Sequence, residues 1–289
     1  MHALWMLSAC FLFATMGACV KLAGGHFNAG QTVGMRGLLP LLLIGAWVFW
    51  HRLSLASPHW KSHLYRSTAG SIAMLMYFAA IARLPLATAV TLNNCSALFV
   101  AAAVALRQPP PRAVSGALLL GFAGVVLVLR PTFTPEQWAG GLLGLGSAIF
   151  ACIAQLNLRE LGRAGEPEWR TVFFLSASNV VLAAPLAILQ PSSPLEAGPI
   201  EWCFLLTVGL CGGLGQLALT RAFKLGRAII TASLGYTTVI FSSLYGALLW
   251  HEHIPPLSWL GMLLIIVTSL VITRPATWAR AQDAHGKGS

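Results

Sequence analysis

The chain has 289 residues, of which 57% are hydrophobic and only 9% carry a formal charge. Soluble domains contain roughly 25% charged residues, so this composition excludes an ordinary water-exposed globular protein. The net charge of +10 comes from 18 Lys and Arg against 8 Asp and Glu, and Asp283 is the single aspartate. One aspartate excludes enzymes built on paired aspartates, Asp-bound magnesium or an Asp-oriented triad.

Apolar segments long enough to cross a bilayer recur along the whole chain. About 20 predominantly apolar residues cross the hydrocarbon core of a membrane. Ten segments approach this length if Arg36 is counted inside the short second one. They are Met1–Val20, Gly37–His51, Ser67–Ala82, Leu84–Leu106, Ala113–Leu129, Gln137–Leu158, Thr171–Leu195, Trp202–Thr220, Ala228–His251 and His253–Thr273. The sequence therefore predicts an all-α integral membrane protein with ten transmembrane helices, and Pro40 and Pro185 lie inside two of them, where kinks are tolerated.

The basic residues give this bundle an orientation. With a cytoplasmic N-terminus, 14 Lys and Arg, Arg66 among them, fall on the inside, against Lys21, Arg36, Arg83 and Arg130 on or towards the outside. Such an excess on one side follows the positive-inside rule and supports an even number of spans. We expect a bacterial inner (cytoplasmic) membrane protein with both termini cytoplasmic. The basicity is then a topology signal, and no nucleic-acid partner is expected.

The two halves of the chain resemble each other weakly. Leu84–Ala89 aligns with Leu225–Ile230 at a spacing of 141, and Leu129-Arg130-Pro131 matches Thr273-Arg274-Pro275. Each half carries five helices, and an odd number inverts the second copy in the membrane. Inverted repeats are typical of secondary transporters, with the substrate near the midplane between the halves. We expect five-helix repeats over 1–131 and 132–275, followed by a disordered cytoplasmic tail over 276–289.

Several short motifs, in order along both halves, resemble a known family. They are Gly17-Ala18-Cys19-Val20-Lys21, Arg36, Ala82-Arg83-Leu84-Pro85-Leu86-Ala87, Leu249-Trp250-His251-Glu252, and Pro255 to Gly261. Over essentially the entire chain the sequence resembles the ten-helix EamA-type members of the drug/metabolite transporter superfamily. It departs from the family pattern at Gln108, where a Glu is frequent, and at Ser96-Ala97, where a Pro often follows. The missing proline is expected to alter how the fourth helix bends.

Neutral polar side chains inside the apolar segments are the candidate substrate contacts, because such groups are functional by default in a membrane. The fourth segment carries Asn93-Asn94-Cys95-Ser96, and the other candidates are Tyr77, Gln155, Gln216, Tyr236 and Thr237. The resemblance implies that helices three, four, eight and nine line a central cavity, with Tyr77, Asn93, Asn94, Gln216 and Tyr236 facing the substrate. The alternative is that these groups only hold helices together, at about 0.6 kcal/mol per contact. Gly140-x-x-x-Gly144 and Gly209-x-x-x-Gly213 predict close helix packing.

Three charged residues towards the outside form a second group, a gate or vestibule. Lys21 or Arg36 attracts an anionic group there, or Arg36 pairs with Glu252; Lys21 alternatively anchors its helix at the interface. The resemblance makes Glu252 a polar cap on helix nine. His251-Glu252-His253 does not predict a metal site, since adjacent helical positions point in different directions. No metal and no cofactor are expected.

The middle of the bilayer contains no carboxylate and no histidine in this sequence. A proton-coupled pump usually carries a titratable group there, so we expect facilitated diffusion or exchange by alternating access. The leading hypothesis is a secondary transporter that exports small polar or zwitterionic metabolites, such as amino acids. An importer and a flippase for lipid-linked intermediates are the alternatives, the flippase being disfavoured because the cavity helices carry no cation. A membrane-embedded enzyme lacks every motif it would need. Partners are the substrate and membrane lipids, with the chain a monomer or homodimer.

Overall fold

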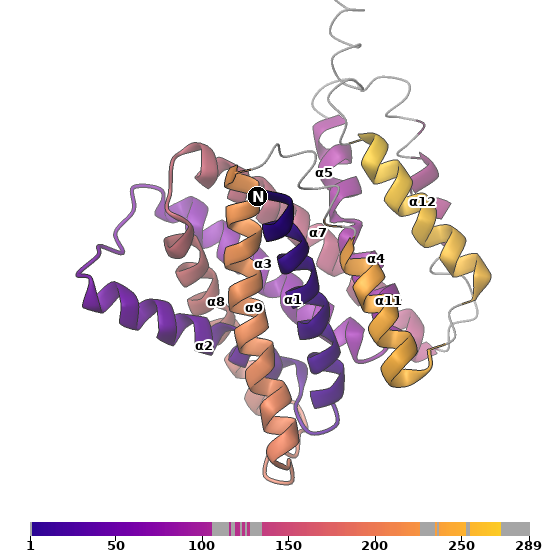
Figure 1. The fold of residues 1–289 in the computed structure, drawn as a ribbon, viewed down its shortest axis with the longest axis horizontal. Helices are drawn as coiled ribbons and strands as arrows, with labels where there is room; N and C mark the ends of the chain where they lie inside the picture. The colour runs from indigo at the N-terminus through magenta and orange to yellow at the C-terminus, as the bar shows by residue number, and fades with distance from the viewer. Residues whose placement is uncertain are drawn as a thin grey trace, which may run out of the picture.

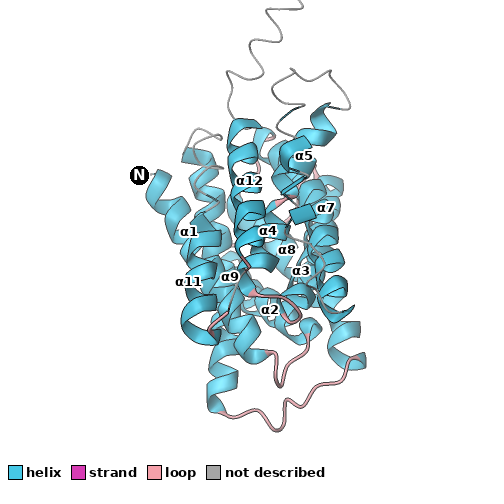
Figure 2. Cartoon of the chain, turned by 90° about the vertical axis from the view of Figure 1, so that its right-hand side faces the viewer, coloured by secondary structure: helices cyan, strands magenta, loops and turns pink. Residues whose placement is uncertain are grey.

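The computed structural model describes residues 2–105, 135–225, 237–252 and 255–272, together with residue 235 and short stretches between 116 and 127. Within these ranges the chain is helical and contains no strand (Figure 1; Figure 2). The helices are α1 (His2–Ala23), α2 (Ala29–Trp50), α3 (Trp60–Ile81), α4 (Leu86–Asn94), α5 (Ser96–Ala105), α7 (Pro135–Arg163), α8 (Glu168–Leu189), α9 (Pro199–Leu225), α11 (Thr237–Trp250) and α12 (Pro256–Ile272). The predicted all-α membrane fold is confirmed.

These helices follow the predicted segments closely. In the described ranges, α4 and α5 together match the fourth segment, and the other helices each match one. The predicted fifth segment lies mostly outside the described residues, as do Gln108 and the tail over 276–289. Arg36 lies inside α2, as predicted, and both Pro40 and Pro185 are accommodated within helices.

The surface of the bundle is apolar, and small residues are common among its buried side chains. Five helices of the described chain are long and apolar enough to cross a membrane: Leu4–Ala23, Ala29–Trp50, Gln137–Gly162, Glu168–Leu189 and Pro199–Ala222. Large side chains such as Phe49 and Ile188 point outward and are more than 80% exposed, whereas Ala14, Ala80 and Ala183 are fully buried. Lipid surrounds such a bundle without driving its helices together, so close packing by small residues stabilises it.

The glycine pairs predicted to pack helices do so. A Cβ on Gly209 or Gly213 of α9 would lie 2.9 Å or less from atoms of α2, and one on Gly140 of α7 would lie 2.9 Å from Arg83 and Leu84. On Gly144 a Cβ would lie 3.0 Å from the side chain of a leucine in α4. These glycines let the helix backbones approach closely, and the packing prediction is confirmed.

The contacts between helices follow a pattern that is kept when the two halves of the chain are exchanged. The helix α1 packs along α9 and α3 along α7; α2 also contacts α9, and α3 contacts α8. The helix α1 contacts α11, and in the same way α7 contacts α4 and α5. The helix α2 packs along α8. Each pair maps onto another when the first five predicted spans are exchanged with the second five. Two related halves would produce this pattern. The pattern supports the inverted repeat, which stays a prediction.

The fourth predicted segment consists of two consecutive helices, which a one-residue turn at Cys95 separates. The helix α4 ends at Asn94, Cys95 is in a turn, and α5 begins at Ser96. The Cys95 amide bonds to Leu92 O at 3.1 Å and the Leu98 amide bonds to Cys95 O at 2.9 Å. In each bond the amide donates to the carbonyl three residues earlier, which tightens the chain at that point, as in a short 3₁₀ turn. The interruption therefore occurs without the proline that the family often has.

Candidate functional site

The interruption between α4 and α5 brings four predicted substrate contacts together. Ser147 Oγ on α7 donates to Asn93 Oδ1 at 3.1 Å, and Gln155 Nε2, two turns further along α7, donates to Ser96 Oγ at 2.9 Å. The Asn94 side-chain nitrogen is buried and has no hydrogen-bond partner. Because an unpaired buried amide is costly, this nitrogen is a donor available to a bound molecule. The group of Asn93, Asn94, Ser96 and Gln155 is called the amide group below.

The other predicted contacts are spread over three more helices. Tyr77 is buried in α3, and Thr237 is half-buried at the start of α11. Gln216 is buried in α9, where its Oε1 lies 3.5 Å from the Arg36 guanidinium. Tyr236 lies outside the described residues. Among the hydrogen bonds of the described chain, none joins Tyr77, Gln216 or Thr237 to the amide group.

Glu252 connects three helices at one end of the bundle. Its carboxylate accepts hydrogen bonds from Lys21 Nζ and, at 3.0 Å, from the Leu86 amide, and its own amide donates to Gly246 O at 3.2 Å. Glu252 therefore ends α11 through its backbone and caps the N-terminus of α4 through its side chain, where Pro85 provides no side-chain cap. The Lys21 and Glu252 side chains are 19% and 8% exposed, so most of this ion pair is removed from solvent.

Arg36 does not pair with Glu252, which is one of the alternatives left open by the sequence. Lys21 pairs with Glu252 instead, and Lys21 Nζ also lies 5.0 Å from the centre of the Trp250 ring. Arg36 is instead 3% exposed inside α2, packed against α9, with its Nε buried and without a partner. It is therefore a buried charge in this conformation, and its role at a gate or vestibule stays a prediction.

Arg66 corrects a further expectation, because the cavity helices, α3 among them, were expected to carry no cation. Its predicted place among the cytoplasmic basic residues stays a prediction. The helix α3 begins at Trp60, six residues earlier, so Arg66 lies about 9 Å along it at 1.5 Å per residue. It is 6% exposed, and within the described residues its guanidinium has no hydrogen bond or ion pair.

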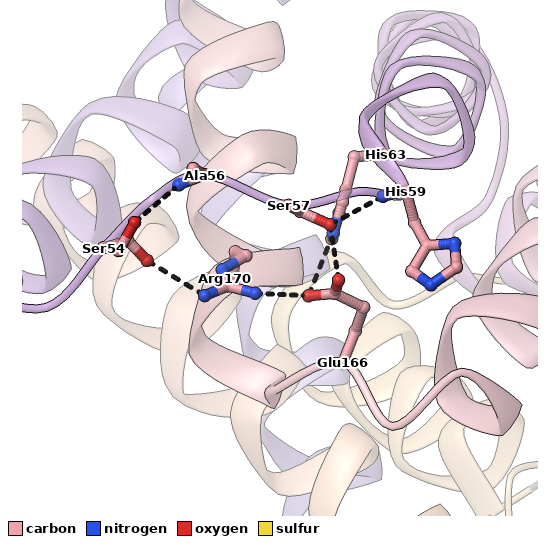
Figure 3. Close-up of polar contacts among 7 residues, drawn as sticks. All are labelled: Ser54, Ala56, Ser57, His59, His63, Glu166 and Arg170. Atoms are coloured by element: carbon pink, nitrogen blue, oxygen red, sulfur yellow. Dashed lines mark hydrogen bonds and ion pairs between the residues drawn. The ribbon is translucent and has the colours of Figure 1, made fainter.

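A second carboxylate, which the sequence analysis did not single out, organises the loops at the other end of α2 (Figure 3). Glu166 precedes α8 and accepts hydrogen bonds from Ser57 Oγ and, at 2.7 Å, from Arg170 Nη1. His63 Nε2 lies 3.4 Å from the same carboxylate, and Arg170 also donates to Ser54 O at 2.9 Å. The cluster ties the loop between α2 and α3 to the start of α8.

The surroundings of Glu166 determine its protonation. Burial acts to raise the pKa of this carboxyl, but the hydrogen bonds from Ser57 and Arg170, together with the nearby His63, outweigh burial and hold the pKa below its ordinary value of 4.5. Glu166 is therefore ionised at neutral pH. No sequence motif marks this cluster, because its members come from separate loops and helix ends.

Two pockets on the described surface lie at opposite ends of α2. One is lined by Val48, Arg52 and Phe173, and the other by His26, Asn28 and Ser192, among other residues. Neither is lined by a predicted site residue. Arg36, Arg66 and Ser96 are buried in this conformation. The other members of the amide group, Asn93, Asn94 and Gln155, are half-buried.

Comparisons with known proteins agree with this architecture. The chain is 32% identical over 268 residues to the pseudopaline exporter CntI of Pseudomonas aeruginosa, covering 92% of this chain and 93% of that protein. It is 25% identical to a riboflavin transporter of Vibrio cholerae, covering 94% and 92%. A solved crystal structure that is 19% identical superposes with a TM-score of 0.68 over 97% of this chain and 98% of that one, which shows a shared fold.

The EamA-like transporter family matches residues 1–130 and 138–274. These two matches cover nearly all of the helices described above, and the relatives named as transporters cover more than nine-tenths of the chain. Together with the lipid-facing surface of the bundle, they identify a multi-pass membrane protein. The chain belongs to the EamA-like transporter family, within the drug/metabolite transporter superfamily.

Proposed function

We propose that this chain is a secondary transporter that exports small polar or zwitterionic metabolites across the bacterial cytoplasmic membrane. The observation that carries the proposal is the interruption of helix four at the amide group. Interrupted transmembrane helices are tolerated where they line a cavity, and in transporters they form substrate sites near the midplane. Asn94 offers an unpaired buried donor there, next to hydroxyl and carboxamide groups that suit a neutral or zwitterionic molecule.

Alternating access needs a closure on each side of the site, and the two carboxylate clusters are suited to that role. The Lys21–Glu252 pair fastens α1 and the end of α11 to the N-terminus of α4. The Glu166 cluster fastens the α2–α3 loop to α8 (Figure 3). We propose that the first is the outer closure and the second the cytoplasmic closure, in the orientation that the basic residues predict.

The direction and energy source follow from two separate arguments. No carboxylate or histidine lies in the middle of a predicted span, which favours facilitated diffusion or exchange over proton coupling. Export is favoured by the similarity to a protein named as an exporter. Import is the second candidate, because another relative is named only as a transporter, of riboflavin. We propose no catalytic activity and no cofactor, with metabolite and lipid as the partners of a monomer or homodimer.

Metabolite analysis of cells that produce the chain tests this proposal. We expect small amino-acid-like compounds to accumulate in the medium relative to cells without the chain. In cells that produce Asn94→Ala, the accumulation should fall by up to about tenfold, the effect of losing one well-placed hydrogen bond. Asn157→Ala is the matched control, because the Asn157 amide donates only to Ile153 O on its own helix.

Purified protein in liposomes separates the mechanisms. Facilitated diffusion predicts that an identified compound equilibrates down its gradient, and exchange predicts that it moves only against a counter-substrate. Accumulation driven by an imposed pH gradient alone contradicts both. Depletion of the medium by producing cells identifies an importer, and movement of a lipid-linked compound identifies a flippase.

A further inference from the structure

The two buried arginines lie on α2 and α3, and both of these helices pack against α8. Arg36 lies on α2 beside Gly37, and a Cβ on Gly37 would lie 2.7 Å from Asn179 Cβ on α8. Asn179 Oδ1 accepts a hydrogen bond from Ser71 Oγ on α3 at 2.7 Å, and Ser71 follows Gly70, which contacts Arg66. We call Arg36, Arg66, Ser71, Asn179 and Gln216 the arginine cluster.

The Arg66 side chain extends along α3 towards Gly70, away from the N-terminus of that helix. A Cβ on Gly70, one turn deeper along α3, would lie 2.5 Å from Arg66 Nη1. A basic side chain near a helix end normally extends towards the headgroups, and helical side chains lean towards the N-terminus of their helix. Arg66 does neither, because the absent side chain of Gly70 leaves room for its guanidinium in the interior.

Arg36 also extends inward, from the opposite end of the bundle. Its Cγ would lie 2.7 Å from a Cβ on Gly212, and its Nη2 lies 3.5 Å from Gln216 Oε1, one turn further along α9. In the predicted orientation that direction leads from the outer surface towards the midplane. The two guanidinium groups therefore extend towards the interior from opposite ends of the bundle. Each arginine side chain packs against a glycine, Gly212 for Arg36 and Gly70 for Arg66.

The cluster has unused hydrogen-bond donors and no negative charge. The buried Arg36 Nε, Arg66 Nε and Asn179 Nδ2 have no partner. The sequence has no acidic residue before Glu136, and the acidic residues of α8 and α9 are Glu168 and Glu201, in their first turns. Two cations removed from water without a counter-charge are costly, and such residues in membranes mark substrate paths.

We propose that the arginine cluster is an anion subsite that binds the carboxylate or phosphate group of the transported metabolite. A guanidinium presents paired N–H donors that match the two oxygens of either group. Asn179 Nδ2 is a further buried donor without a partner, on the helix α8 that both α2 and α3 contact. The statement that the bound anion is the transported metabolite rests on the proposed transport function. It narrows the substrate class from polar or zwitterionic metabolites to those bearing an anionic oxygen group.

Anion binding to the purified full-length chain provides the first test. Citrate, acetate and inorganic phosphate are added in detergent at matched ionic strength, and the apparent Tm is compared with that in sodium chloride. We expect at least one anion to raise the Tm by about 2–4 °C, through preferential binding to the folded state. The shift should disappear in Arg36→Gln and Arg66→Gln and remain in Arg83→Gln. Arg83 is the matched control because it is exposed and its guanidinium donates to Ala79 O on its own helix.

The anion-free proteins provide a second, independent readout. If the arginines bind cargo, Arg66→Met should unfold at the same or higher temperature than the wild type without anion, because an unpaired buried charge has been removed. A structural role for Arg66 predicts the opposite, a lower Tm. Arg36→Lys, which keeps the charge but loses the paired donors, should retain part of the anion response.

The transport readout separates this inference from the proposed function. Compounds released by cells that produce the wild type should carry a carboxylate or phosphate, and Arg36→Gln and Arg66→Gln should lower the release at least about 30-fold. If the released compounds lack an anionic group, or both variants release as much as the wild type, the anion subsite is wrong and transport stands. If no compound is released but the Tm shifts depend on Arg36 and Arg66, the transport proposal fails and the anion site stands. Absence of any anion-dependent Tm shift in the wild type overturns the subsite.

Discussion

The carboxylates at the ends of the bundle and the arginines in its interior have opposite surroundings. Glu252 accepts from Lys21 and from the Leu86 amide, and Glu166 has three side-chain donors around it. Arg36 and Arg66 are buried at least as deeply, yet each keeps an Nε without an acceptor. The negative charges are thus fully used within the protein, whereas the interior positive charges are not.

This difference distinguishes groups that hold helices from groups that await a ligand. A carboxylate surrounded by donors from several elements fixes those elements relative to one another, and removing it leaves a charge or a helix end unsatisfied. A buried guanidinium with unused donors and no counter-charge destabilises the empty protein. Replacing an end carboxylate should therefore lower stability, whereas replacing an interior arginine should lower transport.

The largest stability effect is expected at Glu252. Glu252→Gln leaves Lys21 without its counter-charge at a mostly buried position, and the free energy of unfolding should fall by about 3 kcal/mol. Thermal unfolding of the purified protein measures this change. The exposed Glu196→Gln is the control and should have little effect. A double-mutant cycle with Lys21→Met should show that the two losses are not additive, and additive losses would mean that the pair contributes no coupling.

A smaller effect should follow from disturbing the close contact that supports the arginine cluster. A Cβ on Gly37 would lie 2.5 Å from Ser176 O and 2.7 Å from Asn179 Cβ, so Gly37→Ala pushes α8 away from α2. We expect a loss of about 2 kcal/mol and a weaker anion response. Gly34→Ala, on the same helix with nothing within 4 Å, should instead be neutral or slightly stabilising. Equal effects of the two substitutions would show that this contact is not tightly packed.

The sequence predicted most of the fold because apolar length and charge asymmetry are local quantities. Ten apolar segments, two internal prolines and two glycine pairs can each be read from one short stretch. The interruption at Cys95 could not be predicted in this way, because no glycine or proline marks it. It depends on two hydrogen bonds in which the Cys95 and Leu98 amides donate to the carbonyl three residues earlier. It also depends on the contacts of Asn93 and Ser96 with α7.

The charged contacts depend on residues that are far apart in the chain, which explains why their partners were not predicted. Lys21 and Glu252 are separated by 231 positions, so the sequence could name both residues without showing that they pair. The partner considered for Glu252 was Arg36. Arg66 follows a hydrophilic stretch and was counted with it. The available signal was Gly70, four residues later, where a missing side chain leaves room for a long one on the same helix face.

Acid should weaken the Glu166 cluster selectively. Its pKa is held below 4.5 in the folded protein, so ionised Glu166 contributes stability at neutral pH that is lost as the pH falls below 4.5 and through the folded pKa. Charged and titratable groups around it include Arg170, His63 and His59. We expect Glu166→Gln to lower stability by about 1 kcal/mol at pH 7 and to flatten the decline below pH 4.5. An unchanged decline in the variant would assign the acid sensitivity to other groups.

The smallest stability effect, and the sharpest separation of stability from transport, is expected at the amide group. Ser147 Oγ donates to Asn93 Oδ1 and to Gly144 O, so Ser147→Ala removes a hydroxyl that orients the carboxamide. Polar contacts between membrane helices contribute about 0.6 kcal/mol, and the apparent Tm should change little. Transport should fall several-fold, because Asn93 loses the contact that fixes its side chain at the interruption. Thr207→Ala is the control, since its hydroxyl donates only to Cys203 O on its own helix. If Ser147→Ala and Thr207→Ala transport equally well, the contact with Asn93 is helix packing alone, and the substrate path avoids the interruption.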